Sequence, residues 1–175
     1  MLIREAKESD AADIARVQVD AWRTTYKGIV PDSYLTSLNY ENREQRWQQI
    51  LASDENHFAF VAETEDKQIV GFASAGKNRE PSEDFAGELY AIYVLENYQH
   101  QGIGKLLTRA VAQRFLKQET FSILVWVLAE NPFRAFYESL GGKYVSEKEI
   151  VIGNLPLIEV AYGWKNLDIL LEELG

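Results

Sequence analysis

Apolar residues in the first third of the chain recur every three or four positions, which is the spacing of a helix face. Over residues 9–26 this face consists of Ile14, Val17, Ala21, Trp22 and Thr25. We therefore expect a short strand over 1–6, a helix over 9–26 that ends before Gly28, and a second helical region that begins at Pro31 and runs to residue 53.

The period changes after residue 57, where short runs rich in Val, Ile and Phe replace the helical spacing. These runs predict strands over residues 58–64, 69–76, 88–95, 121–128, 143–152 and 157–163. The residues 65–68 between the first two runs suggest a hairpin. Helical spacing returns over 102–117, 132–140 and the Leu-rich residues 166–174.

The order of these elements predicts the fold class. A strand, a helix and a strand follow one another over 88–95, 102–117 and 121–128, which implies one parallel pair joined by a right-handed crossover. The remaining strands follow each other through short connections and favour antiparallel pairing. We expect an α/β (or α+β) fold of three layers, with a mixed and mostly antiparallel sheet between helices, in a single domain over 1–175.

Composition narrows the partners. The 175 residues are 46% hydrophobic and carry a net charge of −9, which is typical of a compact protein and disfavours binding to nucleic acid or to an anionic membrane. A cationic partner is favoured. The longest uncharged apolar runs, 121–129 and 150–158, are far shorter than the ~18 residues of a membrane span, and Arg4 and Glu5 interrupt any signal peptide. We expect a soluble cytoplasmic protein.

Cysteine is absent, which excludes disulfides, thiolate metal ligands and a thiol nucleophile. The two histidines, His57 and His100, lie far apart and have no carboxylates at the spacing of metal ligands. We therefore assign no metal site.

The most informative segment is the glycine turn between the strand 88–95 and the helix that follows it. Gly102 and Gly104 remove side chains where the first N–H groups of the helix lack internal partners, which forms a site for a phosphate. Glycine is also common in such turns for steric reasons alone. An ATP-binding loop is disfavoured because Leu106 replaces the required Ser or Thr, and a dinucleotide turn is disfavoured because Leu107 replaces the third glycine.

The pattern Gln99-x-x-Gly102-x-Gly104 resembles the signature turn of the GNAT superfamily of N-acetyltransferases, and the order of elements is similar to that fold over essentially the whole chain. The resemblance implies that this turn binds acetyl-coenzyme A. Its pyrophosphate would lie on the amides of the turn, residues Gln101, Gly102, Ile103, Gly104 and Lys105. The backbone of Ile92 and Val94 would pair with the pantetheine arm.

A second match covers residues 131–142, where an Asn follows a strand and a Tyr lies on the next helix. The resemblance places Tyr137 near the sulfur as the proton donor, although its apolar neighbours also fit a purely packing role. We expect Asn131 to cap the helix beginning at Pro132 and to contact pantetheine. Gly142 departs from the family, which usually has an aromatic residue there.

The acceptor side is less defined. Strand alternation places Glu88, Tyr90, Ile92 and Val94 on one face. Glu88 is the candidate base or anchor for a cationic amine, and a merely solvated carboxylate is the alternative. By the same resemblance, Tyr26 and Trp22 are candidates for the acceptor wall, with a core role as the alternative for Trp22.

The sequence therefore predicts an enzyme that transfers an acetyl group from acetyl-coenzyme A to a primary amine of a small molecule or peptide. Without cysteine, we expect direct attack in a ternary complex. The alternatives are a non-catalytic sensor that binds acyl-coenzyme A and a nucleotide-binding regulatory domain. The leucines of 167–174 indicate either internal packing or a homodimer contact.

Overall fold

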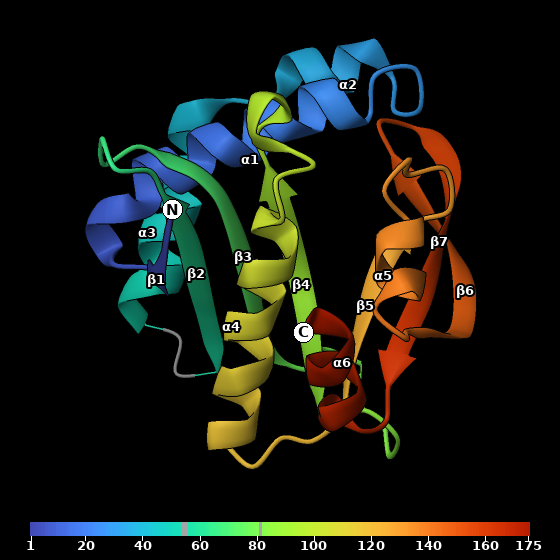
Figure 1. Cartoon of the computed structure of the whole chain (residues 1–175). Helices are drawn as coiled ribbons and strands as arrows, with labels where there is room; N and C mark the ends of the chain where they lie inside the picture. Colours follow the sequence, from blue (N-terminus) through green and yellow to red (C-terminus); the bar gives the residue numbers. More distant parts are fainter. Residues whose placement is uncertain (54–55, 81) are drawn as a thin grey trace.

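A computed structural model describes residues 1–53, 56–80 and 82–175 of the protein (Figure 1). The strands are β1 (Leu2–Glu5), β2 (His57–Glu63), β3 (Ile69–Lys77), β4 (Gly87–Val94), β5 (Ile123–Leu128), β6 (Lys143–Ile152) and β7 (Leu155–Trp164). The helices are α1 (Ala11–Thr25), α2 (Asp32–Ser37), α3 (Tyr40–Ser53), α4 (Ile103–Lys117), α5 (Ala135–Ser139) and α6 (Leu167–Leu174), with short 3-10 helices at Glu8–Asp10 and Glu96–Tyr98.

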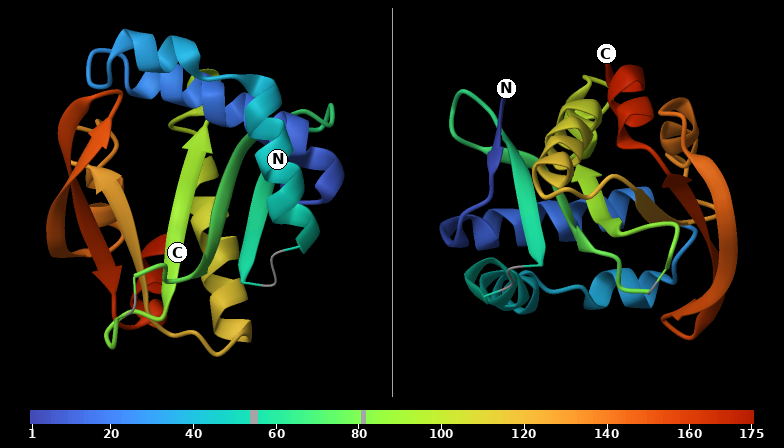
Figure 2. Two further views of the ribbon diagram at one scale, coloured as in Figure 1. Left: turned by 180° about the vertical axis from the view of Figure 1, so that it is seen from behind. Right: turned by 90° about the horizontal axis from the view of Figure 1, so that it is seen from below.

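The strands form one seven-stranded sheet in the order β1-β2-β3-β4-β5-β7-β6. Every neighbouring pair is antiparallel except β4 and β5, which are parallel and joined through α4. Helices α1 and α3 cover one face, and α4, α5 and α6 lie on the other (Figures 1 and 2). The predicted fold class, a mixed sheet between two helical layers with one parallel pair, is confirmed.

The parallel pair separates soon after it begins. Pairing between β4 and β5 covers only Gly87–Leu89 and Ile123–Val125. Beyond Leu89, no strand in the described part of the chain pairs with the edge of β4 that faces β5, and the two ribbons diverge toward their carboxyl ends (Figure 2). The sheet is therefore open at its centre, and a ligand can reach the β4 backbone there.

An extra residue in β4 corrects one prediction from the sequence. Ser74 of β3 pairs with Ala91, but the next residue, Ala75, pairs with Leu89, so Tyr90 is a β-bulge. The bulge reverses the alternation of side chains along the strand. Glu88 therefore lies on the same face as Ala91 and Tyr93, toward α1, whereas Ile92 and Val94 lie on the face of α4. The expected common face of Glu88, Tyr90, Ile92 and Val94 is wrong.

Several element boundaries also differ from the predictions. The helical region 31–53 is two helices, because Leu38 is extended and the side chain of Asn39 accepts a hydrogen bond from the amide of Asn42 at 2.9 Å to start α3. The helix predicted from Pro132 begins at Ala135 and is preceded by a turn. The predicted hairpin at 65–68 is confirmed, since the amide of Thr64 donates to the carbonyl of Gln68.

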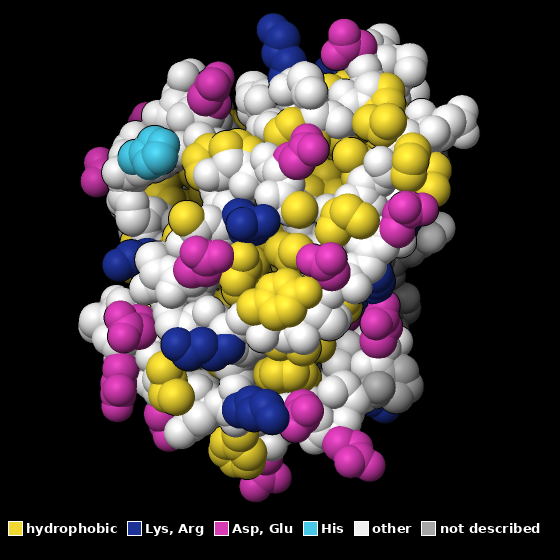
Figure 3. All heavy atoms as spheres, turned by 90° about the vertical axis from the view of Figure 1, so that its right-hand side faces the viewer, with side chains coloured by type: hydrophobic (Ala, Val, Ile, Leu, Met, Phe, Trp, Pro, Cys, Tyr) yellow, Lys and Arg dark blue, Asp and Glu magenta, His cyan; other side chains and the backbone are white. Residues whose placement is uncertain are grey.

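The remaining apolar residues are buried in α6 and exposed on the edge strand β6. Leu167, Leu170 and Leu174 of α6 are buried, and α6 packs on α4, so the packing alternative holds for these leucines. At the end of the sheet, β6 exposes Tyr144 and Val151. Figure 3 shows apolar side chains on this side of the molecule interspersed with charges of both signs.

Candidate active site

Two cavities lie on opposite faces of the sheet and meet at the opening between β4 and β5. One, of about 350 Å³, lies on the α4 side, and the other, of about 510 Å³, lies on the side of α1, β6 and β7. Both are lined by Ile92, Tyr93, Asn131 and Tyr137. Groups bound in the two cavities would therefore approach each other beside these four residues.

The glycine turn forms one wall of the α4-side cavity. Gly102 is the N-cap of α4 and has a φ of 81°, a left-handed conformation that favours glycine. A Cβ on Gly104 would meet only Phe136, at 3.4 Å from its Cζ. The first N–H groups of the 15-residue helix lack internal partners and carry its positive dipole. This wall suits an anion, and the apolar side chains opposite it suit an aliphatic arm.

Most predicted coenzyme-binding residues line this cavity, which is also bordered by Tyr98, His100, Phe133 and Phe136. The predicted residues on its surface are Ile92, Val94, Gln99, Gly102, Ile103, Gly104, Lys105, Asn131 and Tyr137. Gln101, predicted to contribute its backbone amide, is not among these lining residues, and its side chain donates to the carbonyl of Asn97 at 3.1 Å. Gln99 donates to the carbonyl of Val94 at 3.0 Å and so fixes the turn to the end of β4.

Tyr137 connects the two cavities. Its side chain is buried and packs between Phe136 and Tyr162, with ring centroids at 5.5 Å and 6.2 Å. No hydrogen bond joins its hydroxyl to any residue in the described ranges. Burial raises the pKa of Tyr137, with a smaller effect from nearby Tyr26, so the hydroxyl is neutral at physiological pH. It is available to donate a hydrogen bond to a ligand.

The close approach of α5 to β7 explains why Gly142 stands where the family usually has an aromatic residue. A Cβ at this position would lie 2.7 Å from the indole of Trp164 and 2.7 Å from the carbonyl of Tyr137. Trp164 fills this space and donates its indole N–H to the carbonyl of Leu140 at 2.7 Å. The departure from the family pattern therefore leaves the position of Tyr137 intact.

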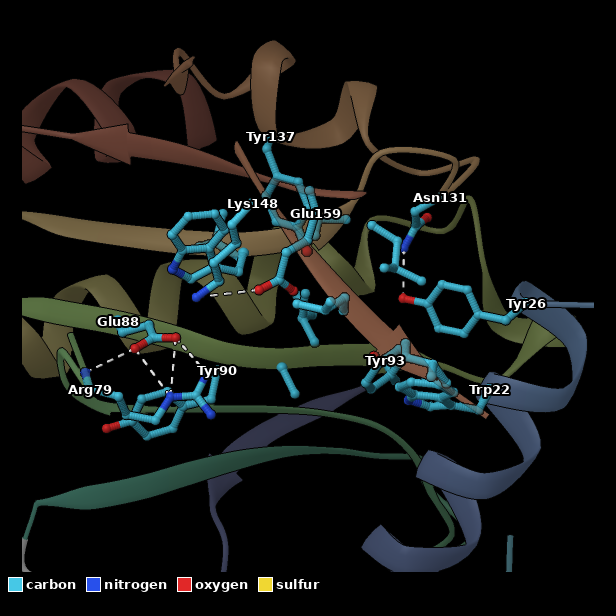
Figure 4. Close-up of a pocket in the computed structure, with 18 of the residues that line it drawn as sticks. Trp22, Tyr26, Arg79, Glu88, Tyr90, Tyr93, Asn131, Tyr137, Lys148 and Glu159 are labelled. Atoms are coloured by element: carbon cyan, nitrogen blue, oxygen red, sulfur yellow. Dashed lines mark hydrogen bonds and ion pairs between the residues drawn. The ribbon is translucent and has the colours of Figure 1, made fainter. Parts of the chain in front are cut away.

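An aromatic wall on α1 closes one end of the larger cavity (Figure 4). The rings of Trp22 and Tyr26 lie 4.6 Å apart, and Tyr93 is next to them. Asn131 donates to the hydroxyl of Tyr26 at 3.0 Å and accepts from the amide of Phe133 at 2.8 Å. Asn131 therefore caps the turn before α5 rather than the helix itself, and it links the aromatic wall to the α4-side cavity.

Glu88 lies toward the other end of this cavity and is 1% exposed. Both of its oxygens are bound by Arg79: the guanidinium approaches to 2.5 Å and the Arg79 amide donates at 3.0 Å. The guanidinium also lies 4.6 Å from the ring of Tyr90. The solvated alternative for Glu88 is therefore wrong. Arg79 was missed because it lies in a charged loop without periodicity, although a buried carboxylate requires such a partner.

Sequence reasoning also missed a charged group on the β6–β7 side. Lys148 of β6 lies with its ammonium 4.1 Å from the centre of the Trp126 ring and 3.5 Å from a carboxylate oxygen of Glu159, and it contacts Glu80. All four residues line the larger cavity. Burial raises the pKa of Glu159, and Lys148 partly opposes this shift. Burial by itself would lower the pKa of Lys148, but its acidic neighbours outweigh burial and raise it.

Within the described ranges, no three His, Cys, Asp or Glu side chains converge as they do around a metal ion. None of the helices in that part of the chain is long and apolar enough to cross a membrane.

Comparison with known proteins identifies the family. Residues 17–142 match the acetyltransferase (GNAT) family. The chain is 43% identical over 96% of its length, and 95% of the other chain, to the N-acetyltransferase YuaI of Bacillus subtilis. It is 25% identical over 78% of its length, and 85% of the other chain, to a protein of Thermoplasma acidophilum named spermidine N(1)-acetyltransferase.

Solved structures agree on the fold. The PaiA N-acetyltransferase of Thermoplasma acidophilum, crystallised with coenzyme A, has a TM-score of 0.74 at 20% identity, with 93% of this chain and 98% of that one covered. A ribosomal-protein-alanine N-acetyltransferase of Brucella melitensis has a TM-score of 0.72 at 25% identity, covering 94% and 99%. The protein therefore belongs to the GNAT family of N-acetyltransferases.

Proposed function

We propose that the protein transfers an acetyl group from acetyl-coenzyme A to a primary amine of a small molecule or peptide, by direct attack in a ternary complex. The observation that carries this proposal is the meeting of two cavities at the opening between β4 and β5. A donor on the α4 side and an amine on the opposite side would meet past Tyr137 and Asn131. No covalent enzyme intermediate is required, and the chain has no cysteine to form one.

The α4-side cavity fits coenzyme A in its charge and in its polarity. The amides of Gly102, Ile103 and Gly104 suit the pyrophosphate, and the apolar side chains of Phe133 and Phe136 suit the pantetheine arm. The free edge of β4 offers backbone hydrogen bonds beyond Leu89. Bound acetyl-coenzyme A supplies a thioester, whose carbonyl carbon bonds to the amine nitrogen while its bond to sulfur breaks.

The residues around the opening would serve this exchange in separate ways. The amine loses one proton and the departing sulfur gains one. Tyr137 is positioned to donate the proton to sulfur, since its hydroxyl is neutral and has no partner among the described residues. Tyr26 and Trp22 would orient the acceptor. Glu88 would either take the amine proton through water or hold the acceptor's ammonium before deprotonation.

The names of similar proteins leave the acceptor open. One relative is named for spermidine, a small polyamine, and a structural neighbour is named for the alanine of a ribosomal protein. Both names refer to acceptors that carry an amine, which supports an amine as the general class of acceptor. Glu88→Gln distinguishes the two roles of Glu88: a lower kcat at saturating amine would indicate a base, and a higher KM alone would indicate an anchor.

The donor can be tested without knowing the acceptor. We expect calorimetric titration to give tight binding of acetyl-coenzyme A and coenzyme A, and none of ATP or NAD. Thiol release is then measured across a panel of amines, and because the protein has no cysteine the signal comes only from coenzyme A. Binding without release on any amine would support the sensor alternative, and binding of ATP or NAD instead would refute the proposal.

A further inference from the structure

The charged group at the β6–β7 side of the larger cavity has the form of a binding site for an alkylammonium ion. The Lys148 ammonium lies over the Trp126 ring, at 4.1 Å from its centre, and between the carboxylates of Glu80 and Glu159. An indole face and carboxylates are the two kinds of group that attract an ammonium most strongly. We call Trp126, Glu80 and Glu159 the ammonium cage.

Two members of the cage, Trp126 and Glu159, are held by the sheet, whereas the ammonium between them is carried by a flexible stem. Trp126 is on β5 and Glu159 on β7, and these strands are paired with each other. The side chain of Glu159 is 17% exposed, and that of Lys148 is 36% exposed on the edge strand β6. Lys148 can therefore swing into solvent on its four-carbon stem, while most of the cage stays in place.

The charges around the cavity favour a second cation. Among the described lining residues, three carboxylates (Glu80, Glu88 and Glu159) face two cations (Arg79 and Lys148), and both cations are already paired. The raised pKa of Lys148 keeps its amine protonated, so it is a poor nucleophile toward the thioester. An acceptor with a carboxylate at its far end would meet an excess of negative charge.

We propose that the acceptor is an aliphatic diamine or polyamine. One amine lies at the opening between β4 and β5, and a second, protonated amine replaces the Lys148 ammonium in the cage. This inference rests on the proposed acetyl transfer and names its substrate class. Lys148 is then an internal competitor that occupies the cage in the absence of acceptor and lowers the affinity for diamines.

The test compares acceptors that differ only at the end remote from the reacting amine. A series of α,ω-diamines is assayed beside the n-alkylamines and ω-amino acids of the same chain lengths. We expect diamines to have the highest kcat/KM. Lys148→Met keeps the aliphatic stem but removes the charge, and it should lower the KM for diamines about tenfold relative to the KM for n-alkylamines. Lys143→Met, on the same strand but outside the cavity, is the matched control.

Glu159→Gln tests the cage itself. We expect it to lower the kcat/KM ratio of diamine to alkylamine by about tenfold, because only the diamine brings a second ammonium to the cage. Calorimetric titration of the diamine into protein saturated with coenzyme A gives the same comparison without turnover. Weaker binding in Glu159→Gln and tighter binding in Lys148→Met are expected.

Three results would overturn the proposal. A preference for ω-amino acids that is lost in Lys148→Met would mean that Lys148 binds a substrate carboxylate. Equal diamine-to-alkylamine ratios in both variants and the wild type would mean that the cage does not contact the acceptor. Peptides acetylated in preference to every diamine would refute the substrate class alone. Failure of the acetyl transfer is separate, because it would appear as no thiol release with any amine.

Discussion

A negative charge at Gly104 is expected to abolish coenzyme A binding without weakening the fold. Gly104 is in the first turn of α4, and a Cβ there would contact only Phe136, at 3.4 Å. Replacing a helical glycine adds up to about 1 kcal/mol of stability, and a carboxylate at a helix N-terminus adds roughly 0.3–1 kcal/mol. At about 2–4 °C per kcal/mol for a chain of this size, Gly104→Glu should melt a few degrees above the wild type.

The effect on binding has the opposite sign. A carboxylate about 4 Å from a pyrophosphate charge costs roughly 4 kcal/mol at the effective dielectric of a protein surface, which is about a thousandfold in Kd. Gly104→Gln has the same size without the charge, and Gly104→Ala has neither the length nor the charge. Comparing the three separates the cost of charge from that of bulk.

The assay is thermal unfolding by circular dichroism with and without coenzyme A. At a ligand concentration of about one hundred times Kd, the wild type should gain about 2.7 kcal/mol, or roughly 5–11 °C. Gly104→Ala should keep most of this gain and Gly104→Glu should lose it. A Gly104→Glu protein that is folded and still gains the full shift would show that the turn does not bind the pyrophosphate, and the placement of the donor would be wrong.

Three other predictions follow from the contacts in the structure. Tyr137→Phe should lower kcat about a hundredfold and lower the calorimetric affinity for coenzyme A far less. An unchanged kcat at saturating acceptor would show that Tyr137 takes no part in the chemistry. In urea unfolding, Arg79→Met should lower the free energy of unfolding by about 3 kcal/mol or more, because it leaves the buried Glu88 charge unpaired. Glu88→Gln should lower it less, because the exposed Arg79 side chain is solvated. A larger loss for Glu88→Gln than for Arg79→Met would contradict this account. The hydrogen bond from Arg4 lowers the pKa of Asp10 in the folded protein. The ionised Asp10 carboxylate therefore stabilises the fold above its unfolded pKa of about 4, and this stabilisation is lost as the pH falls through the folded pKa. Arg4→Met should therefore be less stable than the wild type at neutral pH, with a difference in unfolding free energy that narrows below about pH 4.

The features that could be predicted from the sequence are those with a local signal. Helical and strand periodicity identified most of the helices and all of the strands, and the glycine turn was recognised because its residues are consecutive in the chain. The boundaries that failed have local physical causes outside periodicity. The side chain of Asn39 caps a new helix, so the region 31–53 is divided in two. The turn capped by Asn131 precedes α5, which therefore begins only at Ala135.

The groups that were missed depend on strand register and on loops. Trp126, Lys148 and Glu159 come from three strands, and only the pairing of β5 with β7 and of β7 with β6 brings them together. Each looks like an ordinary strand residue in isolation. Arg79 was missed for another reason: its partner, Glu88, was considered as a possible solvated carboxylate, whereas its burial demands a cation close by.

The bulge at Tyr90 explains why one short strand can serve both cavities. With uninterrupted alternation, Glu88 and Val94 would point to the same face of the sheet. The extra residue places Glu88 in the larger cavity and Val94 in the α4-side cavity. Ile92 and Tyr93, between them, reach both. The strand therefore presents a carboxylate to the larger cavity and apolar side chains to the α4-side cavity. A β4 strand without the bulge would lack this division, because Glu88 would then face α4.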